Sequence, residues 1–408
     1  MAQGQQQAVT LEQAIGMALD ANPNIVQARG DVRVAGAQRR EAIGDWLPSI
    51  SGNSGVSTNS TQRFDEVTQR QVSGNSTSYS AGLSASLTLF DGFRRSASIR
   101  SAGASLESAH ASLTTQRFDI VLQTKQAFYN AVAADDLVRV AQTRIERAEN
   151  QLRISRDKLA AGSAIRSDTL RSFVEVGNAR LQLLNAQTQR ANATANLARL
   201  IGVDGAVQVV PGSTVTEMVR LDTATLRSEA MGGAPAVVQA EAQARAAGAQ
   251  VGVSRSQYFP TVSGSYSQSW AGAQPSSLQG SWSARLSLSF PIFNGFTRET
   301  GMVRSRVAED AAVARVDDAR RQIMAQLTQQ FASLEAATVR YEIAGASRAA
   351  AEEDLRVQQE RYRLGVATIV DVLTSQENLD QAEVDLVQAR LDYMIARAEI
   401  EALIGREL

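Results

Sequence analysis

The sequence contains no cysteine and only one histidine, His110, among its 408 residues. These absences exclude disulfides, thiolate metal sites, a lipidated N-terminal cysteine and catalysis by a pair of histidines. Proline occurs seven times, and aromatic residues make up only 5% of the chain. Acidic and basic residues nearly balance at a net charge of -1, so no basic surface for nucleic acid is expected.

Long apolar runs are also missing. No stretch of about 18 consecutive apolar residues occurs, so the sequence predicts no transmembrane helix. The opening residues Met1 to Gln5 resemble a mature N-terminus behind an added methionine, which is compatible with an export signal that has been removed.

Enzyme motifs are absent too. The sequence has no Walker loop, no nucleophile elbow and no histidine–carboxylate metal pattern. We expect neither an enzyme nor a cofactor or metal site, and we expect His110 on a helix surface or seam.

What the sequence does contain is an internal duplication. Phe90-Asp91-Gly92-Phe93 recurs 203 positions later as Phe293-Asn294-Gly295-Phe296, and Gly162 recurs at the same spacing as Gly365. Nearer the start of each copy the spacing is 212 positions, as in the proline pairs Pro23 with Pro235 and Pro48 with Pro260. The sequence therefore predicts two repeats, at 1–202 and 221–408, joined by an exposed crossover strap at 203–220.

Each repeat is expected to be mostly helical. The first repeat predicts entry helices over 11–44, a long helix over 94–160 and a return helix over 166–201; the second predicts them over 221–257, 297–363 and 368–404. A helix of about 67 residues is a rod of roughly 100 Å, far longer than globular domains use. Apolar and small residues at alternating steps of three and four, from Val372 to Leu403, predict coiled-coil packing of the return helices.

The residues between entry and long helices change to a period of two. Large and small apolar residues alternate with serine, glycine and threonine from Tyr79 to Leu89, and similarly from Trp282 to Phe290. This pattern predicts β-hairpins over 46–90 and 259–291, with strands of about ten residues and polar loops near 57–77 and 271–280.

The hairpins have two interpretations. They could form a half-buried soluble sheet, or they could form the wall of a membrane β-barrel, with apolar side chains toward lipid and serines toward a wet lumen. Four strands cannot close a barrel, because their outer edges would stay unpaired in lipid. A membrane wall would therefore have to be shared by several chains.

Taken together, these features resemble the TolC-like outer-membrane efflux proteins over nearly the whole chain. The resemblance is carried by the two repeats, the prolines before the hairpins, both Phe-x-Gly-Phe motifs and both helix turns. Its strongest segment is Tyr362-Arg363-Leu364-Gly365-Val366-Ala367-Thr368-Ile369-Val370-Asp371-Val372-Leu373.

The resemblance implies an α+β membrane protein of the Gram-negative outer membrane. Its members form homotrimers, in which three chains build a 12-stranded transmembrane β-barrel and a long α-helical barrel in the periplasm. It implies a passive exit duct that works with a periplasmic adaptor (membrane fusion) protein and an inner-membrane transporter of the RND or ABC type. Drug efflux and type I protein secretion are both compatible with this, and a soluble coiled-coil scaffold is the less favoured alternative.

The resemblance also implies a gate at the periplasmic end. Tyr362 and Asp168 match positions that hold neighbouring hairpins together in the shut state, and Asp371 matches a ring of acids that narrows the entrance. The expected gate comprises Asp168, Ser167, Tyr362, Asp371 and Thr374. From the residues alone, the two aspartates could equally be helix caps and Tyr362 a seam residue.

Thr374 departs from the family pattern, because a second acidic residue can stand there. Ala367 likewise stands where a basic residue can occur at the tip. The resemblance thus implies fewer charged contacts in this gate.

Two further sets of residues have expected roles. The resemblance places an adaptor-docking surface at the tips of the hairpins, formed by Gly162, Ser163, Leu364, Gly365 and Val366. The glycines are also expected to supply left-handed turn conformations. Aromatic residues are expected either to anchor the barrel at the membrane interface or to pack its junction with the helices: Phe90, Phe93, Trp270, Trp282, Phe293 and Phe296.

Overall fold

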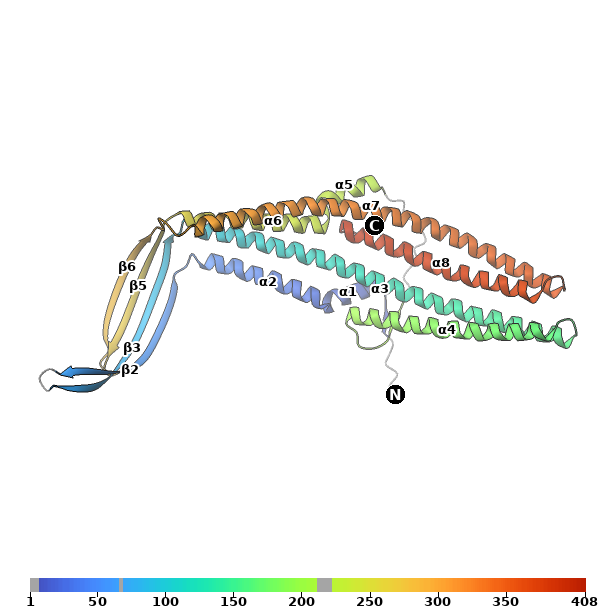
Figure 1. Ribbon diagram of the computed structural model, residues 1–408, viewed down its shortest axis with the longest axis horizontal. Coiled ribbons are helices and arrows are strands. Elements are labelled where there is room, and N and C mark those ends of the chain that lie inside the picture. Colours follow the sequence, from blue (N-terminus) through green and yellow to red (C-terminus); the bar gives the residue numbers. More distant parts are fainter. Residues whose placement is uncertain (1–6, 66–68, 211–221) are drawn as a thin grey trace. The chain divides into compact units, whose positions relative to one another are not determined.

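The computed structural model describes residues 7–65, 69–210 and 222–408 (Figure 1). The chain divides into two compact units. The helical unit comprises Met1–Gly30, Ala111–Gln239 and Asp317–Leu408, and the sheet unit comprises Asp31–His110 and Ala240–Val316. Two long helices, α3 (Arg94–Ala160) and α7 (Thr297–Arg363), contribute residues to both units.

The sheet unit contains one four-stranded antiparallel sheet, whose labelled strands lie side by side in Figure 1. Its strands are β2 (Ser49–Asp65), β3 (Arg70–Phe90), β5 (Thr261–Gly272) and β6 (Gln279–Ser289), in the spatial order β2-β3-β5-β6. Two helices lead into the hairpins: α2 (Pro23–Gly44) and α6 (Pro235–Arg255), the latter extended by the 3-10 turn η1 (Ser256–Tyr258).

The first hairpin is longer than the sequence predicted. Strands β2 and β3 have 17 and 21 residues, so the expectation of strands of about ten residues joined by a loop over 57–77 was wrong. The polar residues there lie in the ladder and pair across it. The hydroxyls of Ser57 and Ser78 lie 2.8 Å apart, and those of Thr58 and Thr77 lie 3.3 Å apart. Loop-like composition thus concealed a strand whose side chains satisfy one another.

The two faces of the sheet differ in chemistry. Ser51, Ser84, Ser267 and Ser283 form one row across all four strands. On the opposite face lie the large apolar side chains, and these remain uncovered in the chain: Ile50 is 74% exposed, Leu286 71% and Leu288 72%. The alternation predicted from the sequence therefore separates a hydroxyl face from an apolar face.

The helical unit contains residues 111–160 of α3 and 317–363 of α7. It also contains α1 (Leu11–Ala21), α4 (Arg166–Ile201), α5 (Thr223–Gly233) and α8 (Ile369–Ile404). Helices α3 and α7 each have 67 residues, and α4 and α8 each have 36. Among the described residues, no helix combines the length and apolar character needed to cross a membrane.

Apolar stripes hold these helices together. One cluster joins Ile120 and Phe128 of α3 to Leu197 of α4, and another joins Leu327 of α7 to Ile400 of α8. On α8, the seam residues from Val372 to Ile400 are mostly buried, as their heptad spacing predicts. Each fully buried leucine or isoleucine contributes about 1.5–3 kcal/mol relative to an exposed one.

A small second sheet was not foreseen. Strand β1 (Gln7–Val9) pairs in parallel with β4 (Val207–Val209), which lies inside the segment expected to be an exposed strap. Val207 and Val209 are buried, so for these residues the expectation of exposure was wrong. Their β-branched side chains pack into the same apolar cluster as Leu197. The remainder of the strap, 211–220, lies outside the described residues.

The C-terminal end of α4 gives a stability prediction. Gly202 caps the helix at φ 71°, and a Cβ there would lie 2.5 Å from the Cβ of Ala21. We expect Gly202→Ala to destabilise the protein by about 1–3 kcal/mol, because a left-handed alanine is strained and its methyl group clashes. Thermal unfolding in detergent, followed by circular dichroism, measures the effect.

Gly16→Ala is the matched control. Gly16 lies inside the same α1 as Ala21, is exposed, and has open space around its Cα. Alanine there should stabilise the helix by about 0.5–1 kcal/mol. Equal melting temperatures for the two variants would contradict the argument.

Candidate functional site at the two helical-hairpin turns

Both helical hairpins turn through a glycine in the left-handed conformation. Gly162 joins α3 to α4 at φ 70°, and Gly365 joins α7 to α8 at φ 80°. The next amide in each turn donates back to the helix, from Ser163 to the Lys158 carbonyl and from Val366 to the Arg361 carbonyl, both at 2.9 Å. These are Schellman turns, which end a helix by satisfying its last carbonyls.

The residues expected to dock a partner all lie at the surface of these turns. Gly162, Ser163 and Gly365 are exposed, and so are the apolar side chains of Leu364 and Val366. Nothing in the described part of the chain covers this pair of apolar side chains. The turns thus present backbone and aliphatic groups, with little charge, at their apex.

Tyr362 lies one residue before the second turn and is buried, with 5% of its surface exposed. It packs with Leu355, Ile369 and Val372 on its own hairpin. The Nζ of Lys158, from α3, lies 4.3 Å from the centre of the Tyr362 ring and also donates to its backbone carbonyl. One cation–π contact therefore ties the first hairpin of the chain to the second.

The Tyr362 hydroxyl is enclosed by the protein. Burial raises the pKa of this hydroxyl, the side chain of Ser155 lowers it, and the negative charge of Asp168 raises it. Of these two expected gate residues, Tyr362 lies at the end of α7 and Asp168 lies in the first turn of α4. Ser167, beside Asp168, is exposed.

Asp371 performs a capping role within the chain. Its carboxylate accepts from the Thr368 amide and hydroxyl, both at 2.8 Å, and the Thr368 hydroxyl accepts from the Asp371 amide at 3.3 Å. These hydrogen bonds lower the pKa of Asp371, and the bond from the Thr368 amide has the largest effect. The side chain of Asp371 therefore remains a carboxylate. Asp371 and Thr374 are both exposed, and each is separate from the Tyr362 cluster.

The sequence analysis missed a charged cluster that lies along the helices of the two hairpins, away from their turns. Arg144 of α3 lies 2.7 Å from Glu175 of α4 and 3.0 Å from Asp380 of α8. Arg147, one turn along, lies 2.7 Å from Asp380 and 2.6 Å from Glu383. These two arginines join three helices through a shared carboxylate, and both arginines are at least half buried, which makes their hydrogen bonds stronger than surface pairs.

The cluster also explains a carboxylate grouping that could suggest a metal. Oxygens of Glu175, Glu377 and Asp380 lie within 4.8 Å of one another. Arg144 pairs with all three, so its guanidinium supplies the positive charge. Its partners are up to 236 positions apart in the sequence, and no local spacing could have revealed them.

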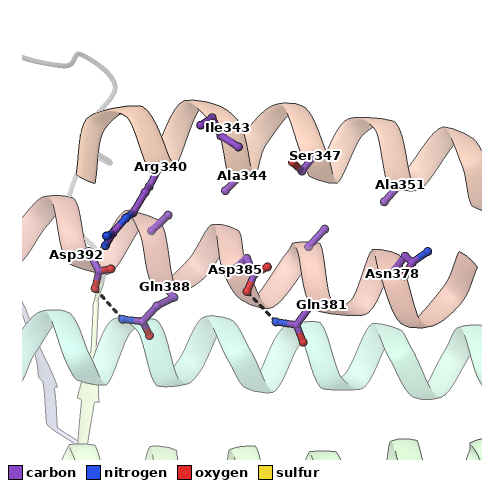
Figure 2. A pocket seen from close by; sticks show the side chains of 12 residues that line it. Arg340, Ile343, Ala344, Ser347, Ala351, Asn378, Gln381, Asp385, Gln388 and Asp392 are labelled. Atoms are coloured by element: carbon purple, nitrogen blue, oxygen red, sulfur yellow. Dashed lines mark hydrogen bonds between the residues drawn. The ribbon is translucent and has the colours of Figure 1, made fainter. Parts of the chain in front are cut away.

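Helices α7 and α8 enclose a groove of about 600 Å³ between them. Figure 2 shows its lining, with Ile343, Ala344 and Ser347 from α7 facing Asp385 and Gln388 from α8. Each aspartate accepts from the glutamine four residues earlier, Asp385 from Gln381 and Asp392 from Gln388, both at 2.8 Å. The groove exists because small residues face each other along the seam.

The aromatic residues expected near a membrane lie in the sheet unit. Phe90 contacts Phe93 edge-on, and Phe293 contacts Phe296 in the same way, each with ring centres 5.5 Å apart. Trp282 is exposed on the apolar face of β6 and stacks with Tyr266, whereas Trp270 on β5 is half-buried. The junction phenylalanines thus pack in pairs, with Phe90 half-buried and Phe93, Phe293 and Phe296 exposed.

These features can be compared with known proteins. The outer membrane efflux protein family matches residues 14–203 and 226–406, which together span most of the chain. The chain belongs to the outer membrane efflux protein family. Its function class is accordingly that of an outer-membrane channel for efflux, as the sequence motifs suggested.

Individual members of the efflux family align over nearly the whole chain. Protein CyaE of Bordetella pertussis is 28% identical over 409 residues, covering 96% of this chain and 81% of CyaE. Outer membrane protein OprJ of Pseudomonas aeruginosa is 26% identical over 408 residues, covering 97% of this chain and 84% of OprJ. The open-state MtrE outer membrane channel of Neisseria gonorrhoeae superposes with a TM-score of 0.81 at 20% identity, covering 97% of this chain and 89% of MtrE. The fold is therefore that of an outer-membrane efflux channel.

The arginine cluster of this efflux protein predicts a pH dependence. Burial raises the pKa of Asp380 to about 6, although Arg144 and Arg147 act in the opposite direction. Because the folded-state pKa lies above the unfolded one, this carboxyl favours the folded state fully below pH 4, and that contribution is lost as pH rises through 6. We therefore compare the melting temperatures of the native protein and the Asp380→Asn variant. The native value minus the variant value should increase when the pH is lowered from 8 to 5.

Asp385→Asn, an exposed change on the same helix, is the control. Its melting temperature relative to the native protein should vary little over the same interval. A native-to-Asp380→Asn difference that is equal at pH 8 and pH 5 would show that Asp380 does not titrate there.

Proposed function

We propose that this efflux protein works as a homotrimeric exit duct. Three chains of four strands would form a 12-stranded β-barrel in the outer membrane, and their long helices would form an α-helical tunnel in the periplasm. The two halves of each chain, as internal repeats, would occupy alternate positions around both barrels. Substrates would pass through passively, without chemistry at the protein.

The observation that carries this proposal is the bare sheet. Its apolar face is exposed in the chain, and its outer strands β2 and β6 each have one edge without a partner among the described residues. In lipid, an unpaired backbone edge costs several kcal/mol per group, so a four-stranded sheet is excluded there unless its edges meet other strands. Lipid would cover the apolar face, and strands of neighbouring chains would pair with the edges of β2 and β6. A soluble scaffold would leave the apolar face in water and the strand edges unpaired.

The hairpin turns would then form the gated periplasmic end. Lys158 with Tyr362, and Asp168 beside them, would hold hairpins together in the shut state, and Ser167 and Thr374 would line the narrowing. Three copies of Asp371 would form an acidic ring. The exposed Leu364 and Val366, with Gly162, Ser163 and Gly365, would dock a periplasmic adaptor.

The energy for transport would come from an inner-membrane transporter of the RND or ABC type, reached through the adaptor. Drug efflux and type I protein secretion would both use such a duct. Isolating the native complex and identifying the transporter that accompanies it distinguishes these two uses.

The duct itself is tested by extraction and conductance. We expect the protein to require detergent, to have the native mass of a trimer, and to form channels in planar bilayers that carry a small resting current. A monodisperse protein without detergent, or a trimer that never conducts, would refute the duct.

The acidic ring predicts ion selectivity. Asp371→Asn keeps an acceptor for the Thr368 amide while removing the charge, so the permeability ratio of cations to anions should fall several-fold. Thr368→Ala is the control, because it removes the cap, at a cost of about 1 kcal/mol, but keeps the charge. Selectivity lost equally in both variants would assign Asp371 to capping alone.

A further inference from the structure

The two hairpins of the sheet unit pair in the same register. Ser49 lies opposite Ser86 in the first hairpin, and Thr261 lies opposite Ser289 in the second. Adding the two sequence offsets reproduces this, since 49 + 212 = 261 and 86 + 203 = 289. Each residue of β5 and β6 therefore has a structural equivalent in the first hairpin, whose longer strands also contain residues without one.

The contact between the two halves inside the chain is well defined at the junction of sheet and helix. A Cβ on Gly92 would lie 2.5 Å from the Cβ of Phe259, so the Phe259 side chain fits directly onto the glycine. The ring of Phe93 contacts the ring of Phe259 edge-on at 6.1 Å. The first half thus presents a glycine and a phenylalanine, and the second half covers them with an aromatic residue.

Polar contacts continue this interface along the helices. Arg245 of α6 lies 2.6 Å from Glu107 of α3. On the same pair of helices the hydroxyl of Ser101 donates to Gln250 at 3.0 Å. The two halves therefore meet through Phe259, an apolar knob that packs on Gly92 and Phe93. Along the helices, the Arg245–Glu107 ion pair joins them as well.

The equivalents of the apolar knob are bare in the chain. Phe259 corresponds to Leu47, because 259 − 212 = 47, and Phe93 corresponds to Phe296, because 93 + 203 = 296. Leu47 is 69% exposed and Phe296 is 67% exposed. Gly295, the equivalent of Gly92, has nothing within 4 Å of its Cβ position. The second half thus carries an uncovered socket, formed by Gly295 and Phe296, and the first half carries an unused knob, Leu47.

The equivalents of the ion pair keep their charges. Arg245 corresponds to Arg33, because 245 − 212 = 33, and Glu107 corresponds to Asp310, because 107 + 203 = 310. Both side chains are exposed, and neither forms an ion pair within the part of the chain that the structure describes. A basic residue and an acidic residue thus stand at matching places, with no ion-pair partner for either among the described residues of their own chain.

We propose that a second copy of this chain completes these contacts, with Leu47 of one copy seated on Gly295 and Phe296 of the next. Arg33 of the first copy then pairs with Asp310 of the second. This inference rests on the proposed homotrimer and specifies how its copies meet. The contact is head-to-tail, because Leu47 and Gly295 belong to different halves of the chain, and such contacts form a closed ring when the rotation between copies closes.

The same rule fixes the pairing of the free strand edges. Leu83 lies opposite Gln268 within the chain. Their equivalents are Leu286 on β6 and Val56 on β2, because 83 + 203 = 286 and 268 − 212 = 56. Strand β6 of one copy therefore pairs with β2 of the next so that Leu286 faces Val56, both on the apolar side of the wall. A slip of one residue would turn one set of side chains to the opposite face.

Cysteine cross-linking tests the knob and socket, since the chain has no cysteine of its own. In Leu47→Cys/Phe296→Cys, oxidation or a short bismaleimide should join copies, giving covalent dimers and trimers on non-reducing SDS gels. The matched control is Phe93→Cys/Phe259→Cys, the equivalent pair inside one chain. That control should react to the same extent without any increase in mass.

Native mass, measured on the same samples, separates the possible outcomes. A trimer in which Leu47→Cys/Phe296→Cys gives no covalent dimer would overturn this inference while leaving the proposed duct intact, with Phe296 then facing lipid. A monomeric native mass would overturn both. A cross-link within one chain only, with no mass increase, would also overturn the inference.

Charge reversal provides a second, independent test. Arg33→Glu and Asp310→Arg should each lower the temperature at which the trimer dissociates in SDS, and the double variant should recover it. Arg245→Glu with Glu107→Arg is the comparison pair, whose effect lies inside one chain and should leave the dissociation temperature nearly unchanged. Single reversals without effect, or a double variant without recovery, would contradict the Arg33–Asp310 contact.

Discussion

The structure depends on hydrogen bonding at the edges of one sheet. Strands β2 and β6 end the sheet within a chain, and their outer backbone groups need partners wherever water is absent. The apolar face makes water an unsuitable neighbour on that side. In the proposed duct, backbone pairing and apolar burial therefore impose the same requirement, and neighbouring copies of the chain would meet it.

Much of this fold was predictable because periodicity survives in the sequence. A period of two marked the strands after Tyr79 and Trp282, and heptad spacing marked the buried seam from Val372 onward. The first hairpin was predicted too short, because its outer part is serine, threonine and asparagine without apolar alternation. Those residues pair with one another across the strands, which composition alone does not reveal. The pairing of β1 with β4 was likewise invisible, since each strand has only three residues.

The candidate site divides along similar lines. Gly162 and Gly365 could be assigned from chemistry, because their left-handed conformations favour glycine. Asp371 was correctly considered as a cap, and its bonds with Thr368 show that role within the chain. The Lys158 contact with Tyr362 and the Arg144–Asp380–Arg147 cluster escaped sequence reasoning. Their members lie more than 200 positions apart, and only the packing of α3 against the second hairpin brings them together.

The arginine cluster makes the two halves of a chain mechanically unequal. The positions equivalent to Arg144 and Arg147 on α7 are Ser347 and Ala350, since 144 + 203 = 347 and 147 + 203 = 350. Opposite them on a neighbouring chain, Glu377 and Asp380 would be replaced by Val174 and Gly177. In the proposed trimer, the ion pairs of this cluster would thus join helices within a chain and would be missing from the matching contact between chains. If the proposed trimer forms, the helices of each subunit would therefore move together, and the proposed gate would open along the boundaries between subunits.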